Sequence, residues 1–112
     1  MKFFYGDRLV RTSKTRFYSH AVMEGDALLS CCGSYDLAVK EKASRISRMD
    51  RAIADYRAAI AAIDSGSGFY WAKFDRKSYK AKVGFSRDEY LAAIEKCEAR
   101  KKNFVIVELE AR

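Results

Sequence analysis

The stretch SYDLAVKEKASRISRMDRAIADYRAAIAAID, residues 34–64, decides the fold of this chain. It contains neither proline nor glycine, so no residue in it is a strong helix breaker. At an ordinary helical rise, a helix over this range is about 45 Å long. Its apolar residues recur at alternating spacings of three and four, which predicts a seam along one helix face: Ile46, Met49, Ile53, Tyr56, Ile60 and Ile63.

A narrow apolar seam on a helix of this length has to be covered by other protein surface. One covering is the chain's own sheet together with its last helix. The other is a second copy of the chain, in a homodimer formed through residues 46–63. The seam is shorter than the roughly three to four heptads that are typical of a coiled coil, which favours the internal covering.

Two β-hairpins are predicted before the helix, because short runs of strand-forming residues flank Gly-Asp turns. Ser34 follows them as the expected N-cap of the helix. The hairpins join residues 3–5 to 8–11 through Gly6-Asp7, and residues 16–22 to 27–32 through Glu24-Gly25-Asp26.

The chain after the helix is predicted to hold further strands and a second helix. The segment 65–68, Ser-Gly-Ser-Gly, ends the long helix, and the segments 69–74 and 79–83 are rich in strand formers. Ser86 and Glu89 have the spacing of a capping box, which starts a helix that runs to about residue 102. Residues 104–109 are almost continuously apolar, which is typical of a strand in the centre of a sheet.

These elements predict an α+β fold in a single domain covering residues 1–112. A mainly antiparallel sheet, made of the two N-terminal hairpins and the C-terminal strand, packs against one long helix and one shorter C-terminal helix. The length of 112 residues and the apolar content of 49% suit one hydrophobic core. We find no apolar run of membrane-spanning length and no secretory signal, so we expect free thiols at the three cysteines and a cytoplasmic protein.

The excess of positive charge is concentrated in one short segment. The chain carries 22 basic and 15 acidic residues, a net charge of +7. Residues 65–85 hold five basic side chains and one acidic side chain, and therefore +4 of that total. Nucleic-acid binders use cations for phosphates and flat rings for bases, so this segment predicts a nucleic-acid-binding surface. Its rings are Phe69, Tyr70, Trp71, Phe74 and Tyr79.

Strand alternation arranges these side chains on the two faces of a basic, two-stranded ribbon. Trp71 and Lys73 are expected on one face of the first strand. Lys80 and Lys82 are expected together on one face of the second strand. The alternative interpretation is that the rings bury into the core and the lysines form its solvated back.

A second basic set surrounds the loop between the two hairpins. It is drawn from Arg8, Arg11, Lys14 and Arg16, and Arg45, Arg48, Lys101 and Lys102 extend it. None of these residues falls in a base-reading motif, so the choice between RNA and DNA stays open. The candidate nucleic-acid-binding residues are Arg11, Lys14, Arg16, Tyr70, Trp71, Lys73, Arg76, Lys77, Lys80 and Lys82.

The cysteines and the only histidine raise the question of a zinc site, since three cysteines and one histidine are a known ligand set. With Gly25-Asp26 as the hairpin turn, His20 is expected opposite Cys31, and Cys97 approaches from the last helix. Cys32 follows Cys31 directly and therefore points to the other face of the strand. We expect core packing, no metal and no cofactor, and leave zinc at His20, Cys31 and Cys97 as an open alternative.

The chain carries no enzyme motif. It lacks a G-x-x-x-x-G-K-[ST] phosphate loop, a G-x-S-x-G nucleophile elbow and an H-E-x-x-H metal motif. We therefore expect a small, non-enzymatic binding module that contacts nucleic acid, or a nucleic-acid–protein complex, through its basic-aromatic surface.

A second hypothesis is a protein-binding inhibitor or adaptor that occupies the surface of a partner, for example an acidic one. In size and character the chain resembles the accessory proteins of phages and other mobile elements, a set that includes anti-CRISPR proteins. The resemblance rests on a small, proline-free chain and on no motif, and it assigns no functional residues. Binding to isolated nucleic acid at physiological salt separates the two hypotheses.

Overall fold

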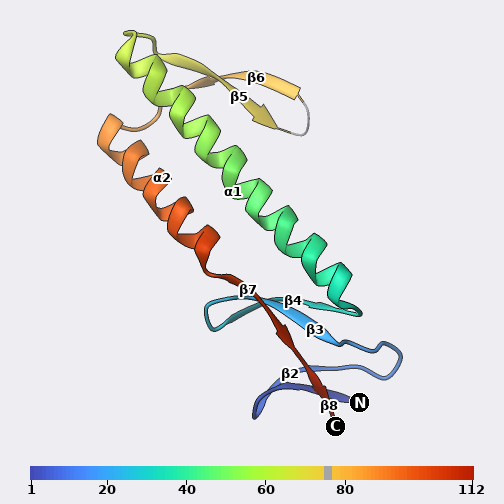
Figure 1. The fold of residues 1–112 in the computed structure, drawn as a ribbon. Coiled ribbons are helices and arrows are strands. Elements are labelled where there is room, and N and C mark those ends of the chain that lie inside the picture. The colour runs from blue at the N-terminus through green and yellow to red at the C-terminus, as the bar shows by residue number, and fades with distance from the viewer. Residues whose placement is uncertain (75–76) are drawn as a thin grey trace. The chain divides into compact units, whose positions relative to one another are not determined.

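The computed structural model describes residues 1–74 and 77–112 and confirms the α+β class. Within these ranges the strands form three antiparallel sheets, accompanied by one long and one shorter helix (Figure 1). The elements are β1 Lys2–Tyr5, β2 Arg8–Thr12, β3 His20–Glu24, β4 Ala27–Cys32, α1 Tyr35–Asp64, β5 Phe69–Phe74, β6 Lys77–Lys82, α2 Arg87–Lys102, β7 Phe104–Glu108 and β8 Glu110–Ala111.

The chain divides into two compact units. The first unit comprises residues 1–46 and 102–112, and the second comprises residues 47–101. The single domain expected over residues 1–112 stays a prediction. Neither helix of the described chain is long and apolar enough to cross a membrane.

The first unit holds two three-stranded sheets, in the strand orders β2-β1-β8 and β4-β3-β7. Both predicted hairpins are present, with Gly6 and Gly25 in their turns at positive φ values of 60° and 58°. The strand β7 forms where expected but lies at a sheet edge, so its predicted central place is wrong. The central strand of that sheet is β3, and Val105 of the edge strand β7 is 42% exposed.

The second hairpin contains a bulge that the sequence does not announce. Its turn is as predicted, with Glu24 paired to Ala27, but the register shifts between Val22 and Met23. His20 therefore lies opposite Cys32, and the predicted pairing of His20 with Cys31 is wrong. The first strand of this hairpin also begins at His20, later than the predicted residue 16.

The long helix α1 begins and ends at the predicted signals. The backbone N–H of Leu37 donates to Oγ of Ser34 at 3.2 Å, which confirms Ser34 as the N-cap. Gly66 follows the helix at a φ of 76°, a conformation that glycine adopts without strain. In the first unit, Ala38 of α1 packs against Val22 and Cys32 to form a small core.

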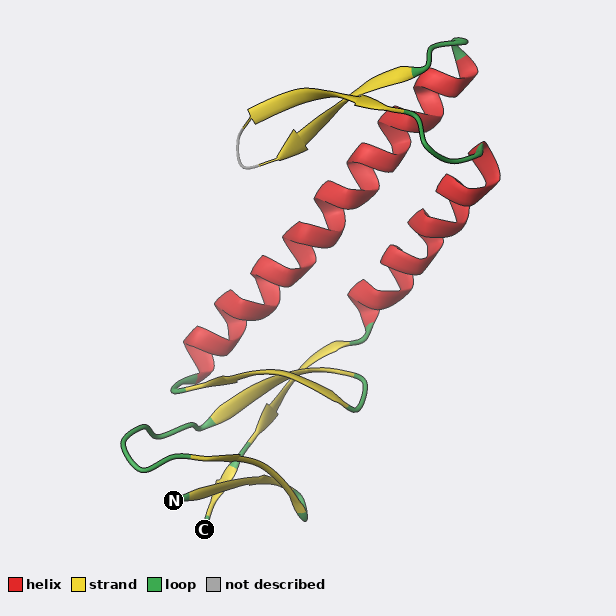
Figure 2. Cartoon of the chain, turned by 180° about the vertical axis from the view of Figure 1, so that it is seen from behind, coloured by secondary structure: helices red, strands yellow, loops and turns green. Residues whose placement is uncertain are grey.

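In the second unit, the chain itself covers the apolar seam. Ala59 and Ile60 of α1 form a core with Tyr90 of α2, and Tyr56 and Ile63 pack against it. The two helices lie side by side here, with β5 and β6 along α1 (Figures 1 and 2). The internal covering is therefore found for this part of the seam, while a homodimer stays a prediction.

The second helix begins at the predicted capping residues. The backbone N–H of Glu89 donates to Oγ of Ser86 at 3.2 Å, and the Ser86 hydroxyl donates to Oε1 of Glu89 at 3.2 Å. Near the other end of α2, Nζ of Lys101 lies 2.6 Å from Oδ1 of Asp50 on α1. This ion pair lowers the number of unpaired cations on the second unit.

Candidate nucleic-acid interface

The basic-aromatic segment folds as a two-stranded ribbon, as predicted. The strand β5 pairs antiparallel with β6, so that Phe69 lies opposite Lys82 and Trp71 lies opposite Lys80. The second strand begins at Lys77, slightly earlier than the predicted residue 79. Among the described strands, β5 pairs with β6 alone, so the other edge of β5 has no strand partner there.

The two faces of the ribbon differ in composition and exposure. On one face, Phe69 and Trp71 are 49% and 66% exposed. On the other face, Ala72 is buried, and Tyr70 is half-buried against the core of the second unit. Trp71 and Lys73 share one face of β5, and Lys80 and Lys82 share one face of β6, as predicted. We define the exposed face, called the ribbon face below, as Phe69, Trp71, Lys73, Ser78, Lys80 and Lys82.

Local contacts hold Phe69 in place on the ribbon face. Nζ of Lys80 lies 4.6 Å from the centroid of the Phe69 ring, which is a cation–π distance. Oγ of Ser67 accepts the backbone N–H of Phe69 at 3.2 Å and donates to the carbonyl of Phe69 at 3.0 Å. These residues line a shallow hollow of about 170 Å³ together with Trp71. Trp71 is the more exposed of the two rings, and it lies opposite Lys80 in the ribbon.

The other predicted residues of the second unit have different places. Tyr70 belongs to the half-buried face, where burial first and then the neighbouring Tyr90 and Asp55 raise the pKa of its hydroxyl above 10.0. Lys77 is exposed and lies opposite Phe74, in register with the face that carries Tyr70. Arg76 lies outside the described residues.

The second basic set belongs to the first unit. The guanidinium of Arg11 lies 4.9 Å from the ring centroid of Tyr18, and the backbone N–H of Arg16 donates to Oγ of Ser13. Lys14 is exposed in the same loop. These residues therefore remain candidates for nucleic-acid binding, as a set separate from the ribbon face.

Some cations that were expected to extend the second basic set form ion pairs with carboxylates. Nε of Arg45 lies 2.9 Å from Oε1 of Glu41, and Lys101 bridges Asp50 and Glu98. Such pairs reduce the positive charge that these side chains present to an anion. They are weaker candidates for phosphate contacts than Lys80 and Lys82 of the ribbon face, which have no carboxylate partner among the described residues.

Arg48 differs from those cations, because with Arg51 it lines a hollow that was not predicted from the sequence. Both line a hollow of about 330 Å³ in the second unit, together with Ala52, Asp55 and Lys73. The backbone N–H of Lys73 donates to Oδ1 of Asp55 at 3.2 Å, which brings the ribbon to this part of α1. The one available signal is the spacing of Arg48 and Arg51, which places them on one helix face.

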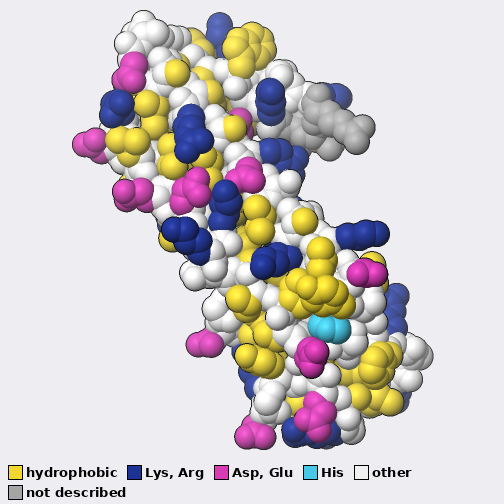
Figure 3. All heavy atoms as spheres, in the orientation of Figure 1, with side chains coloured by type: hydrophobic (Ala, Val, Ile, Leu, Met, Phe, Trp, Pro, Cys, Tyr) yellow, Lys and Arg dark blue, Asp and Glu magenta, His cyan; other side chains and the backbone are white. Residues whose placement is uncertain are grey.

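The first unit carries an exposed apolar groove. Tyr35, which is 57% exposed, lies with its ring centroid 5.4 Å from that of His20. Figure 3 shows hydrophobic side chains gathered beside the histidine. The groove has a volume of about 330 Å³ and is lined by Tyr35, Val39, Lys42, Ala43, Ile46 and Ile106.

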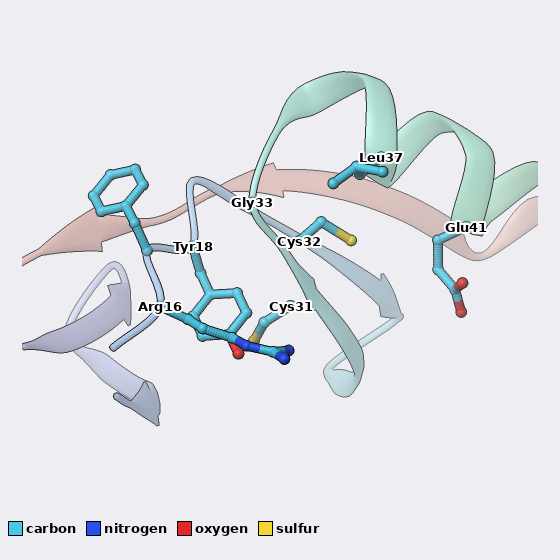
Figure 4. A pocket seen from close by; sticks show the side chains of 8 residues that line it. Arg16, Tyr18, Cys31, Cys32, Gly33, Leu37 and Glu41 are labelled. Atoms are coloured by element: carbon cyan, nitrogen blue, oxygen red, sulfur yellow. The ribbon is translucent and has the colours of Figure 1, made fainter. Parts of the chain in front are cut away.

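A further hollow in the first unit contains both neighbouring cysteines. Cys31 and Cys32 point to opposite faces of β4, as strand alternation requires (Figure 4). Arg16 and Glu41 also line this hollow, which has a volume of about 420 Å³. Within residues 1–74 and 77–112, no three side chains of His, Cys, Asp or Glu are grouped as metal ligands.

In comparisons with known proteins, the chain matches no family model, no curated protein and no solved structure.

Proposed function

We propose that the chain is a non-enzymatic binding module that contacts nucleic acid, free or within a nucleic-acid–protein complex, through the ribbon face. The observation that carries this proposal is the 66% exposure of Trp71 on the same face as Lys73, Lys80 and Lys82. An exposed tryptophan costs the protein the stabilisation that burying it would bring. A nucleobase stacked on its ring restores that burial.

The lysines supply the second half of the interaction. Lys80 and Lys82 lie on the ribbon face and have no carboxylate partner within the described ranges. Their charges attract phosphates, and the counterions that they displace make binding salt-dependent. Stacking rings beside unpaired cations are the combination by which proteins bind unpaired nucleic acid with little sequence preference.

The test is a titration of the purified protein against labelled single- and double-stranded RNA and DNA, at low and at near-physiological salt. We expect binding that persists at near-physiological salt and weakens steeply above it. The variant K80Q/K82Q should bind more weakly, with a salt slope smaller by about 0.7 for each single-strand phosphate that it no longer neutralises. Its control is K40Q/K96Q, which removes two exposed lysines of α1 and α2 and the same net charge.

Equal affinities for K80Q/K82Q and K40Q/K96Q would contradict the assignment to the ribbon face. The second basic set is tested in the same assay with R11Q/K14Q/R16Q, which should also weaken binding if these residues belong to the interface. No binding by the wild-type chain at near-physiological salt would leave the protein-binding inhibitor or adaptor as the better hypothesis. The exposed apolar groove around Tyr35 favours that alternative, because such grooves occur at protein contacts.

A further inference from the structure

We infer that the hollow formed by Arg48, Arg51 and Lys73 is a phosphate seat, and that this seat together with the stacking ring of Trp71 makes the chain a binder of single strands rather than duplexes. This inference rests on the proposed function, because it names the form of nucleic acid that the ribbon face takes. In this arrangement one nucleotide stacks its base on Trp71 and an adjoining phosphate occupies the hollow.

The charges around the hollow favour an anion. Three of the residues that line it are cationic and one, Asp55, is acidic, which gives the lining residues a formal net charge of +2. Within the described ranges neither Arg48 nor Arg51 is paired with a carboxylate. Arginine forks bind phosphate oxygens in pairs, so two guanidinium groups on one helix face provide a seat of suitable chemistry.

Lys73 belongs to both the hollow and the ribbon face. It lines the hollow with the two arginines, and it follows Trp71 by two residues on the same face of β5. Residues spaced by two along a strand lie about 7 Å apart, which one nucleotide can bridge. The stacking ring and the phosphate seat are therefore neighbours on one surface of the second unit.

The stacking ring is the reason for the preference for single strands. In a duplex each base is paired and stacked inside the helix, so its face is not available to Trp71. An unpaired base offers its face without any cost of unstacking a pair. A duplex can still contact the cations, but without the contribution of the ring.

A substitution at Asp55 should raise the affinity for nucleic acid, whereas substitutions at the two arginines should lower it. Its carboxylate accepts the backbone N–H of Lys73, and its negative charge repels a phosphate in the same hollow. In Asp55→Asn the amide oxygen can still accept that hydrogen bond, while the charge is removed. We expect D55N to bind single strands several-fold more tightly than the wild-type chain.

The experiment follows the fluorescence of Trp71, the only tryptophan, during titration with short oligothymidylate, with a duplex of equal length and with an abasic oligomer. Oligothymidylate should quench the fluorescence and bind more tightly than the other two. R48Q/R51Q should lose about tenfold in affinity at near-physiological salt. Its control, K40Q/R57Q, removes two exposed cations of the same helix and should lose less.

The outcomes separate the inference from the proposed function. If R48Q/R51Q and D55N bind as the wild-type chain does while K80Q/K82Q binds more weakly, the phosphate seat is wrong and the ribbon face stands. Equal affinity for duplex and oligothymidylate, without quenching of Trp71, overturns the preference for single strands. Absence of binding to every probe overturns both proposals. Circular dichroism spectra of the variants verify that each one is folded.

Discussion

The backbone N–H of Lys73 donates to Oδ1 of Asp55 at 3.2 Å, and this hydrogen bond ties the ribbon to the long helix. The donor lies on β5, which pairs with β6 alone among the described strands. An unpaired strand edge is open to other strands unless something occupies it. Asp55 occupies one position of this edge with a side chain from α1.

The effect of replacing Asp55 on stability should therefore depend on whether the new side chain still offers a hydrogen-bond acceptor. Asp55→Ala removes the acceptor and should lower the free energy of unfolding by about 0.5–1.5 kcal/mol, the net value of one hydrogen bond. Asp55→Asn retains an acceptor and should stay closer to the wild-type value. Urea unfolding followed by circular dichroism measures both variants, and equal losses would show that the hydrogen bond does not hold the ribbon.

Tyr90 should contribute to the second unit through both its ring and its hydroxyl. The ring is 3% exposed and lies in the core with Ile60, while its hydroxyl oxygen accepts the backbone N–H of Gly84 at 3.1 Å. Tyr90→Phe should cost about 1 kcal/mol, and Tyr90→Ala about 3–5 kcal/mol. Thermal unfolding measures the stability of both variants, and Tyr79→Phe, at an exposed position, is the control. A Tyr90→Phe variant as stable as Tyr79→Phe would contradict the role of the hydroxyl.

The capping hydroxyl of Ser86 should stabilise the start of α2. Ser86→Ala leaves the backbone N–H of Glu89 without its side-chain acceptor and should cost about 1 kcal/mol of unfolding free energy. Ser47→Ala, at an exposed position within α1, should have little effect or stabilise slightly, because alanine is the better helix former. Denaturant titration of the two variants compares them, and similar losses would argue against a specific capping role.

The raised pKa of Tyr70 predicts a loss of stability in alkaline solution. Above pH 10.0 the phenol of the unfolded chain releases its proton before the folded chain does, so unfolding releases protons and stability falls as the pH rises. Tyr70→Phe removes this phenol and should show a shallower decline. Free energies of unfolding at neutral pH and above pH 10 measure it, and identical declines would exclude a contribution from Tyr70.

Features of the fold that depend on neighbours in the sequence are predictable from it. The cap at Ser34 and the turn at Gly25 are confirmed because side-chain chemistry and backbone freedom act over a few residues. The faces of the ribbon are predictable for the same reason, since alternation along a strand is fixed by its backbone. Trp71 can thus be placed on the face of Lys73.

Features that depend on distant partners are not predictable in this way. The bulge near Val22 adds one residue to a strand without changing its apolar pattern, so the predicted register of His20 is wrong by one. The apolar run around Val105 indicates a strand but not whether a further strand lies beside it. The phosphate seat depends on the return of β5 along α1, which brings Lys73 to Asp55, 18 positions earlier in the sequence.

The two units also differ in how far apart in the sequence their pairing partners lie. The second unit is one continuous stretch, residues 47–101, whereas the first needs residues 102–112 to complete both of its sheets. The backbone hydrogen bonds between Lys2 and Arg112 join residues that lie 112 − 2 = 110 positions apart in the sequence. Pairings so distant in sequence form late, because closing the long loop between them costs chain entropy before any contact can stabilise it. We therefore expect the helical pair and the ribbon to fold before β1 and β3 pair with β8 and β7.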